Sequence, residues 1–223
     1  MSPLSSTAMP EAPSTPLGTN GRVGYRVSMQ RPHTHLFDVE AQFPPTDGPL
    51  IVALPVWTPG SYLVREFARH LQEVTAFSEN GDALPLERLD KKRFQISAPG
   101  KPVRLRYRVY ANELTVRTSH LDGSHGYFNG ATVFLYSEAL RHLEHRVAVR
   151  PHPGWIPFSA LPREGEEFVA ADYDELVDSP FEVGPHQPLS FQAAGVPHQV
   201  VVWGDSPIDE QKMVGDLQKV CEE

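Results

Sequence analysis

The chain has 223 residues, a formal net charge of −8 and 40% hydrophobic residues. This acidic balance excludes a protein that concentrates positive charge on the phosphate backbone of nucleic acids, and no apolar run is long enough to span a membrane. The single cysteine, Cys221, excludes an internal disulfide framework and is typical of a reducing compartment, so we expect a cytoplasmic protein.

The chain divides into three parts by composition. Residues 1–21 are rich in Ser, Pro and Thr and lack the cationic start and apolar stretch of a signal peptide, which predicts a disordered N-terminal tail. Residues 22–205 alternate short apolar segments with turn residues, which predicts one β-rich domain. Residues 206–223 predict a helix, because Ser206 can cap its N-terminus and Pro207 suits its first position.

Most of the β-rich part consists of segments with strand patterns. In chain order we expect strands at 23–29, 35–43, 50–56, 71–77, 84–89, 94–97, 103–110, 131–136, 146–150, 168–170, 189–193 and 198–203. The Asn80-Gly81 pair between two of these segments predicts a hairpin. Residues 62–71 fit either one helical turn or an irregular loop, and we favour the loop.

Two segments have a clear division into faces. In 103–110, three arginines alternate with apolar residues, which predicts a solvated arginine face on a strand. The terminal helix places its apolar residues on one side, and that side must pack against the β domain or against another segment. These residues are Met213, Val214, Leu217, Val220 and Cys221.

The most informative segment is the corner that follows the apolar run 50–56. Here Pro59 fixes its own φ and Gly60 permits a positive φ, so the backbone turns rigidly. The corner carries Trp57 and Tyr62 and leads into Arg65 and Glu66.

The Trp57-Thr-Pro-Gly-Ser-Tyr run, followed by Arg65-Glu-Phe, resembles the N-terminal domain of the M61 family of zinc metallopeptidases, the glycyl aminopeptidase-like proteins. Three flanking runs extend the likeness, at 25–29, 126–135 and 174–184. The resemblance implies a mainly β fold, an antiparallel β-sandwich or saddle-like N-terminal domain of a metalloaminopeptidase with a C-terminal α-helix. That helix would begin a catalytic domain, which is the implied partner.

The resemblance also implies a peptide substrate with a small N-terminal residue, and a full-length enzyme that holds zinc through His-Glu-x-x-His and a downstream Glu. Among the ten histidines of this chain, none is followed by another four positions later. We therefore expect no catalytic residue, no cofactor in this chain, and no peptidase activity from it alone. The alternative is a free-standing β-sandwich that binds a ligand or protein, with Trp57, Tyr62 and Tyr127 as an aromatic platform.

By resemblance, one segment is expected to line the pocket for the substrate amine. An Asn carbonyl oxygen can accept a hydrogen bond from an ammonium group, and Gly allows a close backbone approach. The candidate residues are Tyr127, Asn129 and Gly130. An Asn-Gly turn or bulge at the start of a strand would explain the same residues.

Other segments have structural interpretations. We expect the corner to brace the β framework rather than to perform chemistry; its residues are Trp57, Pro59, Gly60, Tyr62, Arg65 and Glu66. Residues 179–182 lie, by resemblance, near the junction with the catalytic domain. His120, Asp122 and His125 could chelate a metal ion, but such a cluster is common by chance, and we predict no metal site.

Overall fold

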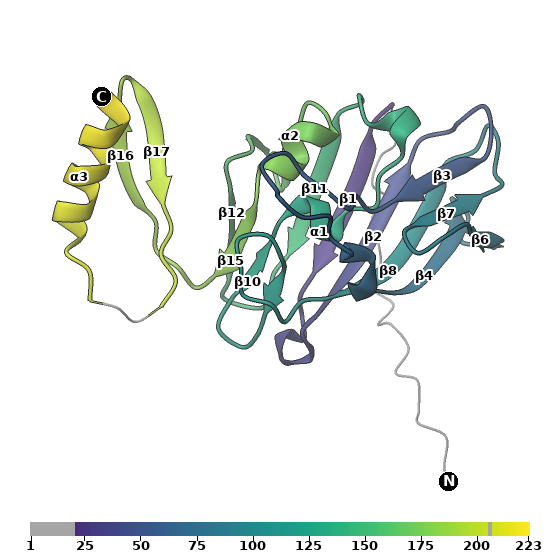
Figure 1. The fold of residues 1–223 in the computed structure, drawn as a ribbon, viewed down its shortest axis with the longest axis horizontal. Helices are drawn as coiled ribbons and strands as arrows, with labels where there is room; N and C mark the ends of the chain where they lie inside the picture. Colours follow the sequence, from purple (N-terminus) through teal and green to yellow (C-terminus); the bar gives the residue numbers. More distant parts are fainter. Residues whose placement is uncertain (1–20, 205–206) are drawn as a thin grey trace, which may run out of the picture.

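The computed structural model describes residues 21–204 and 207–223 of the chain. A β-rich body forms most of the molecule, and a hairpin with one helix lies to one side of it (Figure 1). Residues 1–20 of the predicted tail at 1–21, and Ser206, lie outside the described residues.

The body is built on an eight-stranded sheet with the order β13-β14-β11-β1-β2-β8-β4-β5. All neighbours in it are antiparallel except β1 and β11, which pair in parallel. The strands are β1 Val23–Ser28, β2 Leu36–Phe43, β4 Leu71–Ser78, β5 Ala83–Leu84, β8 Val103–Tyr110, β11 His145–Arg150, β13 Arg163–Glu164 and β14 Glu167–Ala170. The predicted mainly antiparallel β fold is therefore confirmed.

Within the described residues, the remaining strands form three smaller sheets, and short helices lie between the elements of the body. One smaller sheet has the order β12-β15-β10-β9, another β3-β7-β6, and the last is the β16-β17 hairpin. Their strands are β3 Leu50–Ala53, β6 Leu86–Arg88, β7 Arg93–Ile96, β9 His120–Leu121, β10 Gly126–Phe128, β12 Ile156–Ser159, β15 Phe181–Gly184, β16 Leu189–Ala193 and β17 Val196–Val200. The α-helices are α1 Gly130–Val133, α2 Tyr173–Asp178 and α3 Glu210–Glu222, and the 3-10 turns are Pro32–Thr34, Phe67–His70 and Glu138–Leu140.

Alternation along β8 places apolar side chains in the core and arginines on the opposite face, as the sequence predicts. That face is paired rather than simply solvated. Arg106 contacts Glu40 at 3.1 Å, and Arg108, only 6% exposed, contacts Asp38 at 2.9 Å. The acidic partners lie directly opposite on β2, so these cross-strand ion pairs help to fix the register of the two strands.

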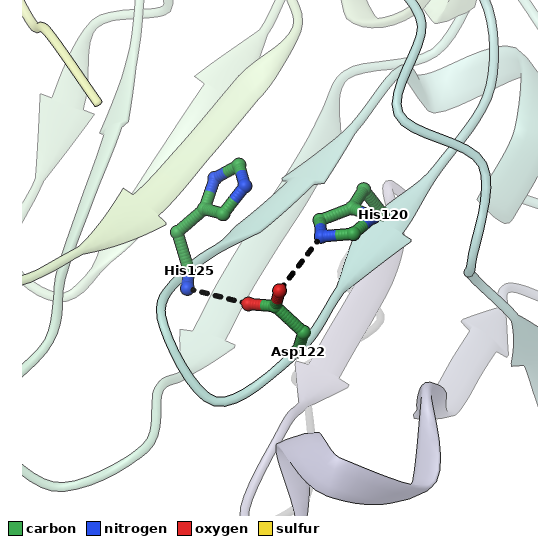
Figure 2. Close-up of side chains that lie close together, drawn as sticks. All are labelled: His120, Asp122 and His125. Atoms are coloured by element: carbon green, nitrogen blue, oxygen red, sulfur yellow. Dashed lines mark hydrogen bonds and ion pairs between the residues drawn. The ribbon is translucent and has the colours of Figure 1, made fainter. Parts of the chain in front are cut away.

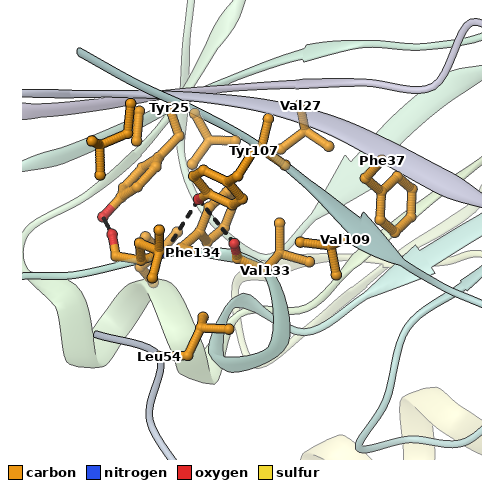
Figure 3. Packing of buried hydrophobic residues seen from close by; sticks show 14 of the residues in the cluster. Tyr25, Val27, Phe37, Leu54, Tyr107, Val109, Val133 and Phe134 are labelled. Atoms are coloured by element: carbon orange, nitrogen blue, oxygen red, sulfur yellow. Dashed lines mark hydrogen bonds between the residues drawn. The ribbon is translucent and has the colours of Figure 1, made fainter. Parts of the chain in front are cut away.

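Three buried tyrosines hold one stretch of backbone inside the core, and Figure 3 shows two of them, Tyr25 and Tyr107. Tyr25 Oη donates to the carbonyl of Leu135 at 2.9 Å, and Tyr173 Oη donates to that of Phe134 at 3.0 Å. Tyr107 Oη donates to the carbonyl of Val133 at 3.0 Å and accepts from the amide of Leu135 at 3.2 Å. Side chains thus satisfy backbone groups that would otherwise be unpaired away from water.

Several local predictions are wrong. The segment 131–136 does not form a strand, because α1 begins at Gly130 and the tyrosine hydroxyls bind the chain that follows it. In the predicted Asn80-Gly81 hairpin only β5 pairs with β4, since the β6 segment turns away and joins β7 in another sheet. Residues 62–71 contain a loop and also a 3-10 turn before β4.

The terminal helix exists, but its start differs from the prediction. The N-cap is Asp209, whose carboxylate accepts from the amide of Lys212 at 3.0 Å, so Pro207 precedes the helix. Met213, Val214 and Leu217 are half-buried and α3 packs against β16, whereas Val220 and Cys221 are exposed. Among the described residues, no helix has the length and apolar character needed to cross a bilayer.

Candidate functional site

The candidate pocket residues lie at the end of β10. Asn129 is the N-cap of α1, and its Oδ1 accepts from the amide of Ala131 at 2.9 Å. The side chain is half-buried. One lone pair of Oδ1 is therefore used locally, and the second is the acceptor available to a ligand.

Gly130 is buried against α2. A Cβ at this position would lie 2.9 Å from the carbonyl oxygen of Leu176 and 3.2 Å from Cα of Val177. The backbone that approaches this glycine closely is therefore that of α2, and Gly130 fixes how α1 packs on α2.

Gly130→Ala is expected to lower the free energy of unfolding by about 1–3 kcal/mol, because the added methyl group meets backbone that cannot move independently. Urea denaturation of the full chain measures the change. Gly123→Ala is the matched control, since a Cβ there meets nothing within 4 Å. Equal stabilities of the two variants would contradict this account of Gly130.

Tyr127 lies in the middle of β10, opposite Glu182 of β15. Its hydroxyl donates to the carbonyl of Val116 at 3.2 Å. Burial, and then the negative charge of Glu182, raise the pKa of Tyr127, so this phenol stays protonated and can donate. Tyr127 also lines a cavity of about 840 Å³ between the β12-β15-β10 strands and the β16-β17 hairpin.

The corner has the predicted backbone. The amide of Ser61 donates to the carbonyl of Thr58 at 3.1 Å across a turn with Pro59 and Gly60 at its centre, and Gly60 has φ +80°. This combination is typical of a type II turn. Trp57 Nε1 closes the corner by donating to the carbonyl of Ser61 at 2.8 Å.

Beyond this turn the large side chains of the corner are exposed rather than packed. Tyr62 is 98% exposed and Trp57 is half-exposed. Glu66 contacts Lys91 at 3.8 Å. Within the described part of the chain, Arg65 forms no ion pair, and its Nε is buried without a hydrogen-bond partner. A cavity of about 440 Å³ separates Trp57 and Pro59 from α2.

A second loop lies beside the corner. Arg69, which follows the corner, contacts Glu113 at 2.8 Å, and Thr132 of α1 shares a 2.6 Å hydrogen bond with Ser119. We call the two loops, residues 57–66 and 112–119, the loop face. Residues 112–119 are bonded to Tyr127 of β10 and Thr132 of α1, and the 3-10 turn that follows residues 57–66 contacts α1.

Sequence reasoning missed part of a histidine cluster. His125 Nδ1 and His186 Nε2 each lie 2.8 Å from Oε1 of Glu182. His120 and Asp122, from the same loop as His125, lie next to it (Figure 2). The spacing of Glu182 and His186 by four residues was the available signal, but nothing in the sequence connects that pair with His125.

The zinc site of the family does not fit the residues present. The sequence has no His-Glu-x-x-His, so it cannot place two imidazoles one helical turn apart with a glutamate beside them. No catalytic step through such a zinc ion can be assigned to this chain.

The fold is that of a mainly antiparallel β domain with a terminal hairpin and helix. The family model described as the Peptidase M61 N-terminal domain matches residues 24–185. This match covers well over half of the chain, so the chain belongs to that family.

The chain is also similar to solved structures. The aminopeptidase N family protein from Idiomarina loihiensis is 33% identical with a TM-score of 0.86, over 90% of this chain and 35% of that one. The chain thus spans about a third of that relative's length. The M1 zinc metallopeptidase from Deinococcus radiodurans is 12% identical with a TM-score of 0.49, over 88% of this chain and 51% of that one. No curated protein matches the chain.

Proposed function

We propose that the chain is the non-catalytic N-terminal part of an M61 zinc aminopeptidase of the cytoplasm. In this proposal it supports a catalytic domain carried by a longer protein and lines part of the pocket for the substrate amine. The long Idiomarina relative supports it, because this chain corresponds to only 35% of that aminopeptidase family protein.

The observation that carries the proposal is the apolar character of the loop face. Its exposed apolar side chains are Trp57, Tyr62, Leu63, Val64, Leu114 and Val116. Contiguous exposed apolar surface marks an interaction site, because water contact with it is unfavourable. We assign this surface to the catalytic domain, since residues 112–119 are bonded to β10 and α1, beside the proposed amine pocket.

The terminal segment fits the same assignment. The family match ends at residue 185, and β16-β17 forms its own sheet with α3 packed on it. We propose that the helix starts the catalytic domain, as the sequence suggests, and that the hairpin belongs with it.

In the amine pocket, Asn129 would accept a hydrogen bond from the substrate ammonium through the free lone pair of Oδ1. Tyr127 would help to position that segment through its bond to Val116. Gly130 would act indirectly, by fixing α1 against α2.

The first test reads the gene beyond the codon for Glu223 and assays both proteins. We expect a His-Glu-x-x-His motif in the following domain, and release of N-terminal Gly or Ala from peptides by the longer protein but not by residues 1–223. Peptide hydrolysis by residues 1–223 alone would overturn the proposal. A gene that encodes no such motif would favour a free-standing binding module.

In the longer protein, Asn129→Ala is expected to lower kcat/KM for an alanyl substrate about 10- to 100-fold, because a hydrogen bond to a charged group is lost. Asn129→Ser is the matched control for helix capping, since Ser also caps well but does not reach the amine. We expect the Ser variant to keep its stability and still lose activity. Full activity in Asn129→Ser would contradict the role in amine binding.

A further inference from the structure

Three histidines and two carboxylates gather where β9, β10 and β15 lie side by side. His120 belongs to β9, and Asp122 and His125 belong to the turn into β10. Glu182 belongs to β15, and His186 follows that strand. In Figure 2 the Asp122 carboxylate lies between the backbone amide of His125 and the ring of His120. The rings of His120 and His125 are tilted relative to each other, with centroids 5.0 Å apart.

The loop between β9 and β10 is rigidly built. Asp122 Oδ1 accepts from the amides of Ser124 and His125 at 2.8 and 3.2 Å and from the hydroxyl of Ser124 at 2.6 Å. Three hydrogen bonds to one oxygen favour the carboxylate form of Asp122. Its other oxygen lies 3.3 Å from Nε2 of His120.

The histidines are buried, and several of their nitrogens lack a partner. His120 is 8% exposed and His125 is 2% exposed. Neither nitrogen of His120 has a hydrogen-bond partner, nor does Nε2 of His125, and the contact of His120 with Asp122 lies outside hydrogen-bond geometry. An unpaired buried polar atom is unfavourable, so these atoms indicate a missing ligand.

Glu182 fixes which nitrogen of His125 is free. Its Oε1 accepts from Nδ1 of His125, so in the neutral ring Nε2 carries the lone pair. A carboxylate that holds one ring nitrogen while the other is free is the arrangement found around metal-bound histidines. Nε2 of His186 lies within hydrogen-bond distance of the same oxygen of Glu182. Gly184 leaves space for the His186 ring, since a Cβ at position 184 would lie 2.2 Å from Nε2 of His186.

Charge favours a cation at this place. Within the described residues, the ion pairs of Asp122 and Glu182 are to histidines alone, and no lysine or arginine neutralises them. Two carboxylates that pair with no lysine or arginine favour a divalent cation beside them. Nitrogen and oxygen donors together suit Zn²⁺ and similar transition metals better than Ca²⁺ or Mg²⁺.

We propose that His120, Asp122 and His125 bind a divalent transition-metal ion such as Zn²⁺, with Glu182 as the positioning residue for His125. One ligand atom from each of the three lies within 4.8 Å of the others. From the sequence these three residues could chelate a metal ion, but no metal site is predicted; the structure adds Glu182 and His186 beside them. This inference does not depend on the proposed function.

The position of the site gives it a structural role. The Trp203 ring stacks on His125 with centroids 4.2 Å apart, and its Nε1 donates to Ser124 at 3.2 Å. Trp203 follows β17, so it belongs to the terminal part of the chain. A metal bound to the His125 loop would stiffen the surface on which this terminal part rests.

Isothermal titration of metal-free full chain with zinc chloride tests the proposal. The chain has no His-Glu-x-x-His, so a zinc site of that kind does not contribute, and the variants below assign bound zinc to its ligands. We expect one zinc ion per chain with submicromolar affinity, and Co²⁺ should give visible d–d absorption and quench Trp203 fluorescence. His120→Gln and Asp122→Asn should each weaken binding by more than the about 10- to 100-fold expected for Glu182→Gln, which alters only the positioning residue.

His33→Gln is the matched control, since His33 is exposed and lies outside the cluster. It should bind zinc like the parent chain, and circular dichroism should show that every variant is folded. The proposal is overturned if the parent chain binds no zinc, or if folded His120→Gln binds it with unchanged affinity. It is also overturned if His186→Gln abolishes binding while His120→Gln does not. The ligands would then be His125, Glu182 and His186.

Discussion

Tyr107→Phe is expected to lower the free energy of unfolding by about 2–5 kcal/mol, since it leaves two buried backbone groups without partners. The hydroxyl of Tyr107 donates to the carbonyl of Val133 and accepts from the amide of Leu135, and no water can replace it because Tyr107 is fully buried. The ring itself is kept, so packing changes little and the loss reports on the hydroxyl.

Urea denaturation of both chains measures this difference. Tyr110→Phe is the matched control on the same strand, because Tyr110 is exposed and its hydroxyl only accepts from Asn112. We expect a change within about 0.5 kcal/mol for that variant, as for other surface substitutions. If Tyr107→Phe were no more destabilising than Tyr110→Phe, the hydroxyl would not be holding the backbone.

Stability is expected to fall by roughly 3 kcal/mol as the pH drops from about 6.5 to about 4, through His145 alone. This residue is 1% exposed and packs beside the rings of Tyr25 and Tyr173. Burial lowers the pKa of His145 to about 4, although the hydrogen bond to Leu143 and the charge of Asp172 oppose the shift. Between about pH 6.5 and 4 the unfolded chain binds a proton at this histidine and the folded chain does not. The stabilisation is therefore fully present above about pH 6.5 and is lost as the pH falls towards 4.

His145→Gln separates this contribution from other titrating groups. Gln can still donate to the carbonyl of Leu143 but does not titrate. Between pH 6.5 and 4 its free energy of unfolding should therefore fall by roughly 3 kcal/mol less than that of the parent chain. His33→Gln, at an exposed position, should keep the full dependence of the parent chain. Parallel curves for the parent and His145→Gln would show that His145 does not titrate in this way. Asp122 affects stability only at lower pH than His145. Its pKa is depressed in the folded chain, so the stability that its carboxylate provides is lost as the pH falls below the ordinary pKa of Asp.

The strands were predictable where one face is buried. Along β1 and β8 every second side chain is apolar, and this period of two gives both the strand and its orientation. The corner was equally predictable, since Pro59 and Gly60 restrict their own backbone. The alternation around 103–110 even predicts the arginine face, although not the acidic partners on β2.

The rest depends on contacts between distant residues. The apolar run after Gly130 fits a strand as well as it fits a helical turn, and hydroxyls from Tyr25 and Tyr107 decide between them. At the last helix both Ser206 and Asp209 are good capping types, so the sequence could not rank them. The histidine cluster needs the pairing of β10 with β15, which no local pattern encodes.

The parallel pairing of β1 with β11 has a consequence for synthesis of the chain. The first strand lies in the interior of the large sheet, yet one of its two neighbours is made only after residue 145. A chain emerging from the ribosome therefore carries an open β edge on Val23–Ser28 until residues 145–150 have been made. Completion of the large sheet depends on this contact between residues far apart in the sequence, and contacts of that kind slow folding.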